Sequence, residues 1–249
     1  MLKRIVGLFV LAVVVVPAAV SQMEPAPIVY TYVSQFQVPR ANWVAYAESS
    51  EKSFVPVAEK LAADGTILSW STFEPVVHTT DGYTNGAAWS SNTISGIMKV
   101  LDELRKNAPS SSQIAATKHE DYFLQTSMYH AGSGTPAYLR VICANVKTDK
   151  PTEYTAMLKK LLVPTFEDQL KKGVATYWGV DEQYVNTAAP STRCVVIDYP
   201  NAESMDKWAA AINATQGKWT PAERAEFAGA TVADSRRDIM ARITHSGHK

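Results

Sequence analysis

The sequence has little cysteine, and its charges are not segregated. Its 249 residues include two cysteines, Cys143 and Cys194, which are too few for a disulfide framework or a cysteine-rich zinc site. Lysine and arginine together number 24, as do aspartate and glutamate, and no basic block stands out. Nucleic acid is therefore not an expected partner, because nucleic-acid-binding proteins usually carry a basic face. Apolar residues make up 46% of the chain, which suffices for a core.

Several motifs of catalysis are also missing. The sequence has no P-loop, no glycine-rich dinucleotide turn after a strand, no Cys/His zinc spacing and no Gly-x-Ser-x-Gly elbow. No metal is therefore expected. The sequence motifs assign no reaction and do not decide whether the protein is an enzyme.

A long apolar run occurs once, at the N-terminus, and is short for a membrane span. Lys3 and Arg4 precede an apolar segment at 5–16, which is below the ~20 residues that a spanning helix needs. Small residues follow, so residues 1–21 are predicted to be a signal peptide cut after Ser21, or alternatively after Ala19. We expect an exported protein, periplasmic or extracellular, with no membrane association after cleavage. The alternative is an uncleaved N-terminal anchor.

The rest of the chain alternates between strand-like and helix-like patterns. Residues 28–38 are rich in β-formers, residues 41–63 carry a helical stripe that Pro56 should kink or break, and residues 67–77 alternate as a strand. A short strand, a helix begun by Asn92 or Thr93 and a fourth strand at 122–130 follow. From Tyr138 the same order returns, with one additional helix predicted at 221–237 and a last strand at 239–245.

The two halves also match residue by residue. The stretch at 65–70 and the stretch at 173–178 both run from glycine to tryptophan, 108 residues apart, and each follows a Val-Pro pair. One gapless offset of 108 relates identical residues from Tyr30/Tyr138 to Lys99/Lys207. Near the end the offset becomes 115, which matches the segment 130–132 to 245–247. The predicted units are 22–131 and 137–249.

This order of elements is βαββαβ, the ferredoxin-like unit, present twice. Two such units can cover each other by closing their sheets into a barrel with the helices outside. The predicted fold class is therefore α+β, two ferredoxin-like repeats forming a pseudo-two-fold barrel. The chain resembles the dimeric α+β barrel superfamily in a fused form. The resemblance implies a monomer with an internal pseudo-dimer, or a homodimer of it, and a ligand site in the sheet–helix cleft or the barrel interior.

Members of that superfamily include small monooxygenases, haem-degrading enzymes and haem peroxidase-like proteins, so the fold alone does not give the function. In haem-binding relatives the axial histidine typically comes from a helix beside the barrel. The predicted helices of this chain contain no histidine. Haem is therefore disfavoured, and no cofactor is expected.

Nine residues are candidates for contact with a ligand. Trp70, Trp178 and Trp89 can wall a cavity, or alternatively pack the core of the sheet. Gln35, Gln37 and Asn145 share one face of the first strand of each half and mark either a polar pocket or a solvated barrel mouth. Asp198 would have a shifted pKa if it points into the barrel. His130 and His245 end matching strands and suit acid–base work, or are exposed strand-end residues, and no carboxylate is expected beside them.

Two hypotheses of function follow. The first is a binding protein that holds a small, mostly apolar ligand in the barrel or the sheet–helix cleft. The alternative is a cofactor-independent, monooxygenase-like oxidoreductase. Cys143 and Cys194 fall on strands that are neighbours in this fold, so they form either a disulfide or two buried thiols.

Overall fold

The computed structural model describes residues 27–79, 82–106, 111–185 and 192–248. The predicted signal peptide lies outside the described residues. The strands are β1 (Val29–Gln37), β2 (Ser69–Pro75), β3 (Asn85–Ser91), β4 (Lys118–Ala131), β5 (Tyr138–Asn145), β6 (Tyr177–Gln183), β7 (Thr192–Tyr199) and β8 (Arg237–His248). The helices are η1 (Arg40–Asn42), α1 (Trp43–Ser53), α2 (Val55–Ala63), α3 (Ile94–Arg105), α4 (Ser111–Ile114), α5 (Pro151–Leu161), α6 (Val163–Lys171), α7 (Ala202–Gly217) and α8 (Pro221–Gly229).

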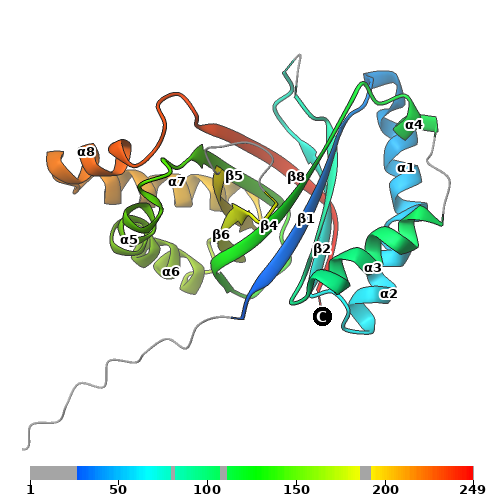
Figure 1. Ribbon diagram of the computed structural model, residues 1–249, viewed down its shortest axis with the longest axis horizontal. Helices are drawn as coiled ribbons and strands as arrows, with labels where there is room; N and C mark the ends of the chain where they lie inside the picture. The colour runs from blue at the N-terminus through cyan, green and yellow to red at the C-terminus, as the bar shows by residue number, and fades with distance from the viewer. Residues whose placement is uncertain (1–26, 80–81, 107–110, 186–191, 249) are drawn as a thin grey trace, which may run out of the picture.

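The strands form one closed antiparallel barrel in the order β1-β3-β2-β8-β5-β7-β6-β4. Figure 1 shows the helices in two groups on opposite sides of this barrel, α1 to α4 on the right and α5 to α8 on the left. The strands are therefore covered by helices on the outside and face one another on the inside. Closure removes the unpaired edges that an open sheet would present.

The fold class predicted from the sequence needs correction. The chain forms a single closed eight-stranded antiparallel barrel, not two ferredoxin-like βαββαβ sheets. The finding that overturns the prediction is the pairing across the two halves: β2 pairs with β8 and β4 pairs with β6, each over a long register. These pairings join strands that are far apart in sequence, so the local order of elements could not reveal them.

Prolines break the first helix of each half as the sequence indicates. Pro56 and Pro164 both lie at the start of a second helix, α2 and α6, because proline lacks the N–H that a helix interior needs. Thr93 and Asn201 cap α3 and α7 by accepting hydrogen bonds from backbone N–H groups. The predicted last helix is too long, since α8 ends at Gly229. None of the described helices combines the length and hydropathy of a membrane span.

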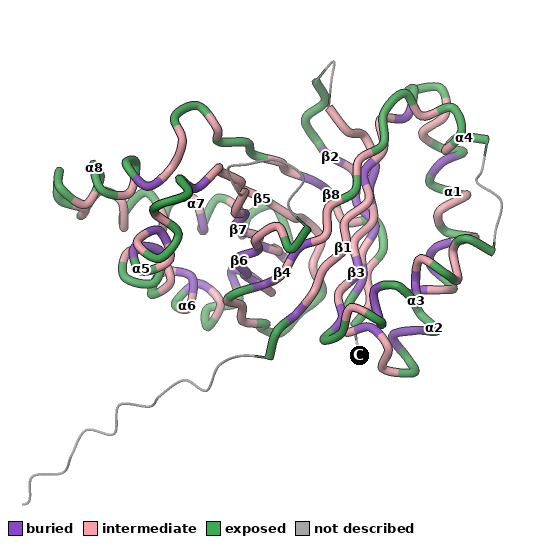
Figure 2. The backbone as a smooth tube through the Cα atoms, in the orientation of Figure 1, coloured by how far each residue is buried: buried purple, intermediate pink, exposed green. Residues whose placement is uncertain are grey.

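Two cores fill the spaces between the barrel and the helices. One contains Trp70 and Trp89 with residues of α2 and α3, and the other contains Trp178 and Ile197 with residues of α5, α6 and α7. Figure 2 shows buried stretches along the strands and mostly exposed stretches in the loops and on α8. Because side chains alternate along a strand, the residues between these outward positions face the barrel interior.

Candidate functional site

Several residues on the interior face of the barrel keep partial exposure to solvent. On β7 the outward residues Val195, Ile197 and Tyr199 are buried, whereas the inward residues Val196 and Asp198 keep partial exposure. Inward residues of other strands are also partly exposed, namely Val33 on β1, Ala88 on β3, and Leu139 and Val141 on β5. An eight-stranded barrel is wide enough to be filled by side chains or to hold one small ligand. Partial exposure of these inward residues is compatible with the second case.

Two glycines on the interior wall make room for aromatic rings. Gly86 on β3 and Gly179 on β6 have inward registers, and neighbouring rings occupy the place of their missing side chains. A Cβ on Gly179 would meet the hydroxyl of Tyr177 at 2.3 Å, so the Tyr177 side chain lies along β6 over this glycine. Tyr177 is thereby directed along the interior wall rather than across the barrel.

A group of polar side chains lies on the interior wall of the second half. Asp181 and Thr126 are directly opposite across the β4–β6 seam, and the Thr126 hydroxyl donates a 2.7 Å hydrogen bond to Oδ1 of Asp181. Tyr177 is also hydrogen-bonded to Thr126, and Asp198 is opposite Tyr177 in the β6–β7 pair. We call these four residues the carboxyl group site: Thr126, Tyr177, Asp181 and Asp198.

Both carboxyls of this site bind protons tightly. Burial raises the pKa of Asp181 to about 6, against the opposing effect of the hydrogen bond from Thr126. Burial, and then the charge of Asp181, raise the pKa of Asp198 to about 7. Burial also raises the pKa of Tyr177. Within the described part of the chain, the Asp198 carboxyl has no hydrogen bond and neither aspartate has an ion pair, so only the Thr126 hydrogen bond to Asp181 offsets the cost of burying their charge.

This arrangement can hold or move a proton near neutral pH. A carboxyl whose pKa is about 7 is populated in both protonation states, and a general acid or base works best when its pKa is near the working pH. The site can equally bind a hydrogen-bond donor or a cationic group, because its oxygens are short of partners.

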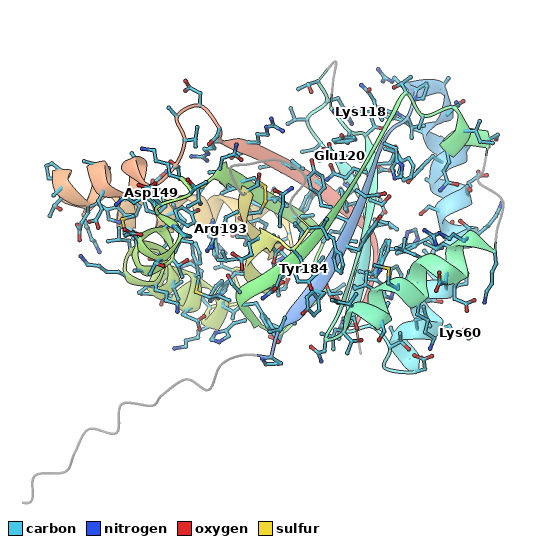
Figure 3. All side chains as sticks on the ribbon, viewed as in Figure 1. Lys60, Lys118, Glu120, Asp149, Tyr184 and Arg193 are labelled. Atoms are coloured by element: carbon cyan, nitrogen blue, oxygen red, sulfur yellow. A yellow bond between two sulfur atoms is a disulfide. The ribbon has the colours of Figure 1, made fainter. Side chains whose placement is uncertain are left out.

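The other end of the interior carries a second polar group. Tyr83 donates a hydrogen bond to Glu120, and burial, followed by interaction with Glu120, raises the pKa of Tyr122 to about 12. The Nζ of Lys118 lies 4.6 Å from the centre of the Tyr83 ring. Figure 3 labels Lys118 and Glu120 near the upper end of β4. Glu120 already has a hydrogen-bond partner, so it is less available to a ligand than Asp198.

Four of the nine residues proposed from the sequence face the interior. Gln35 is 6% exposed and inward, and Gln37 follows it on the same face, where its Oε1 accepts a 3.0 Å hydrogen bond from Thr117. Asn145 accepts a 2.9 Å hydrogen bond from the Thr192 hydroxyl, and Asp198 belongs to the carboxyl group site. The structure therefore places these amides and the carboxyl on one continuous inner surface. Their contact with a ligand stays a prediction.

The other five lie on the outer face. Trp70, Trp89 and Trp178 are 5%, 2% and 2% exposed and belong to the two helix-covered cores. His245 accompanies Thr72 on the outer side of the β2–β8 seam, at 3.3 Å between Nδ1 and the threonine hydroxyl. These positions are separated from the interior by the barrel wall, so they belong to packing and to the sheet–helix face.

His130, contrary to the expectation from the sequence, has a carboxylate beside it. Its Nδ1 lies 2.6 Å from Oε1 of Glu167, and the indole N–H of Trp178 donates to the same oxygen at 2.9 Å. Glu167 comes from α6, 37 positions away, so no sequence spacing could reveal it. The indole N–H of a buried tryptophan needs such a partner, and this contact ties α6 to the barrel wall.

Three members of the carboxyl group site were missed by sequence reasoning. Tyr177 and Asp181 lie four residues apart on β6 and therefore share a face, but the same pattern is compatible with a solvated face. One signal was available: Phe73 occupies the matching position 108 residues before Asp181. A carboxyl in place of a buried aromatic indicates a polar site inside the barrel.

Two surface hollows lie away from this site. One of about 420 Å³ is lined by residues of α1, and one of about 320 Å³ lies at the start of α3 near Thr93 and Lys99. Among the described residues, no group of three or more His, Cys, Asp or Glu side chains is placed to hold a metal ion. The described histidines lie on strands or in a loop rather than on helices. That the protein uses no cofactor, and no haem, remains a prediction.

Comparison with known proteins places the fold. No protein-family model and no curated protein matches the chain. A candidate monooxygenase from Fusobacterium nucleatum is similar in structure, with a TM-score of 0.64, 11% identity and coverage of 90% of this chain and 96% of that one. A candidate monooxygenase from Lactobacillus acidophilus has a TM-score of 0.60, 13% identity and coverage of 88% and 96%. An anthrone oxidase-like protein has a TM-score of 0.56, 8% identity and coverage of 89% and 93%.

Identities this low show a shared fold and nothing about the reaction. The shared fold extends over most of each chain, and it includes the barrel and both groups of helices. The structural neighbours therefore confirm the resemblance drawn from the sequence at the level of the fold: this chain and these structures share one fold.

Proposed function

We propose that this protein binds a small, mostly apolar ligand inside the barrel, with one polar group of the ligand held by Asp198 and Asp181. The observation that carries the proposal is that several inward residues, Asp198 among them, remain partly exposed, while the outward residues Val195, Ile197 and Tyr199 of β7 are buried. Ligand sites are typically apolar cavities with a few convergent polar groups, and this interior has that composition.

The charges of the interior indicate the polar group. Asp181 and Asp198 face the same space, and the Asp198 carboxyl has no hydrogen bond within the described part of the chain. A hydroxyl or a protonated amine would supply the missing donor, whereas a carboxylate would be repelled. The expected ligand is therefore an apolar body that carries a phenol, an alcohol or an amine.

The test compares paired compounds by calorimetry. Phenol-like and amine-bearing aromatic compounds should bind more tightly than hydrocarbons of the same shape, and Asp198→Asn should weaken only the former. A hydrogen bond to a charged group contributes about 1.5–3 kcal/mol, which corresponds to roughly 10- to 150-fold in affinity. Asp149→Asn is the matched control, since Asp149 is exposed between β5 and α5 (Figure 3). Equal binding by Asp198→Asn and the wild type would contradict the proposal.

A second candidate function is cofactor-independent oxygenation of the same ligand. It is supported by the pKa of Asp198, about 7, which suits a base that removes a proton from a phenol, and by the fold shared with candidate monooxygenases. An electron-rich anion formed in this way can transfer electrons to O₂. Oxygen uptake by purified protein with a panel of hydroquinones tests it. Uptake that is unchanged in Asp198→Asn would count against this role.

A further inference from the structure

One level of the barrel interior carries an unusual row of side chains. Five strands present inward residues that are directly opposite one another in consecutive pairs: Arg237 on β8, Cys143 on β5, Cys194 on β7, Asp181 on β6 and Thr126 on β4. The two cysteines form a disulfide, here called the interior disulfide. It therefore lies in the wall of the open interior, between a cationic and a carboxyl residue.

We propose that the interior disulfide is redox-active and exchanges with a small dithiol that enters the barrel. In this reaction Asp181 donates a proton to the sulfur of Cys194. Cys143 is partly exposed and Cys194 is 8% exposed, so the sulfur of Cys143 is the one an incoming thiolate reaches. Exchange requires such access and a favourable environment for the thiolates. Cys143 meets both requirements, since it is partly exposed and lies opposite the cationic Arg237, whereas Cys194 is buried and opposite Asp181 and so leaves as a thiol.

The reaction proceeds in two balanced steps. A thiolate of the dithiol attacks Sγ of Cys143, the bond between the two cysteines breaks, and the Cys194 sulfur leaves and takes a proton from Asp181. The second thiol of the reagent then gives its proton to the Asp181 carboxylate and attacks the reagent's first sulfur in the mixed disulfide, which releases the Cys143 thiolate opposite Arg237. Two electrons pass from the dithiol to the cysteines, and the dithiol leaves as a cyclic disulfide.

The matching strand pair shows that closure of the barrel does not require this bond. The pair β1–β3 has a register that is offset by 108 residues from that of β5–β7, and Gln35 and Gly86 occupy the positions of the two cysteines. That pair forms without a disulfide, through hydrogen bonds and the stacked rings of Tyr32 and Trp89. The disulfide therefore adds chemistry on the inner wall rather than a necessary joint.

The test follows thiol formation in folded protein. Wild-type protein is incubated with dithiothreitol without denaturant, and new thiols are trapped with iodoacetamide and counted by mass spectrometry. We expect both thiols to appear faster than the protein unfolds, with Asp181→Asn slowing the reaction roughly tenfold. The rate of thiol formation should still depend on pH after correction for ionisation of the reagent. Asp181→Asn should remove this remaining dependence. Asp149→Asn should change neither the rate of thiol formation nor its pH dependence.

Three results would overturn the proposal. Thiols that appear only at the rate of global unfolding would show an inert structural disulfide. A protein dithiol that reacts as fast as dithiothreitol would contradict entry through the interior. A rate and pH profile unchanged in Asp181→Asn would remove the role of Asp181. Both this proposal and ligand binding need an open interior, but the exchange assay contains no ligand, so failure of one is distinguishable from failure of the other.

Discussion

Replacing Asp198 by asparagine should make the stability of the protein less dependent on pH. The pKa of Asp198 is raised from 3.8 to about 7, so the folded state binds a proton more tightly than the unfolded state. A raised pKa stabilises the folded state at low pH, and this stabilisation is lost as the pH rises from about 4 to about 7. At higher pH the folded protein must bury a charge that the unfolded protein exposes to water.

The size of the effect follows from the two pKa values. Each pH unit is worth about 1.36 kcal/mol, so the cost of the buried charge is about 0.6 kcal/mol at pH 4, about 2 at pH 5 and about 4 at pH 8. These values are upper limits, because Asp198 is partly accessible and water that reaches it screens the charge. Part of the cost also depends on Asp181, whose charge adds to the rise.

Urea unfolding at pH 4, 5 and 8 measures this cost with the disulfide intact. The stability of Asp198→Asn minus that of the wild type should increase with pH by up to about 4 kcal/mol. The asparagine can carry a packing cost, but that cost is the same at each pH, so the slope is the test. Asp149→Asn should show no such slope, since that residue is exposed. A difference between Asp198→Asn and the wild type that is flat from pH 4 to 8 would refute the assignment of a buried, uncompensated carboxyl.

Three further perturbations test the packing around the site by urea unfolding. Glu167→Ala should cost about 1–3 kcal/mol, because it leaves the buried indole N–H of Trp178 without an acceptor; no loss would show that water replaces the carboxylate. Gly86→Ala should cost about 1–3 kcal/mol of stability, since its Cβ would lie 2.4 Å from the Phe73 ring. Gly217→Ala, whose Cβ would have nothing within 4 Å, should be neutral or stabilising. Equal effects of the two substitutions would contradict the inward packing of Phe73 on Gly86. Changing both cysteines to alanine opens a loop with a sequence separation of 51 and should lower the free energy of unfolding by about 4 kcal/mol. A loss near zero would show that the disulfide does not constrain the unfolded state.

Local features of the fold were predictable from the sequence because they depend on neighbouring residues. The helix breaks at Pro56 and Pro164 follow from the missing N–H of proline, and the caps at Thr93 and Asn201 follow from side-chain chemistry. The ends of elements were less accurate. For example, β4 starts at Lys118, four residues before the predicted start of that strand.

Closing of the sheets into a barrel was expected from the repeat, but the registers across its seams and the site were beyond the reach of pattern alone. A period of two shows which residues share a face of a strand, but in a closed barrel both faces meet protein. An apolar outer face and an apolar inner face then look alike, which is why Trp70 and Trp178 could not be assigned to one of them. The pairings that build the site join residues 55 and 37 positions apart, Thr126 with Asp181 and His130 with Glu167. Such contacts follow from the register across the seams and from helix docking.

The two halves differ on the inside and agree on the outside. Trp70 and Trp178 match at an offset of 108 and each packs in a helix-covered core, so the outward positions serve stability. The inward positions at the same offset are Gln35, Phe73, Gly86 and Ser90 in the first half, and Cys143, Asp181, Cys194 and Asp198 in the second. The first set is satisfied internally: the Phe73 ring lies on Gly86, and Ser90 is hydrogen-bonded to Thr31 at 2.9 Å. The second set places two carboxyls and a disulfide on the interior wall, so both the ligand binding and the disulfide exchange that we propose belong to the second half of the barrel.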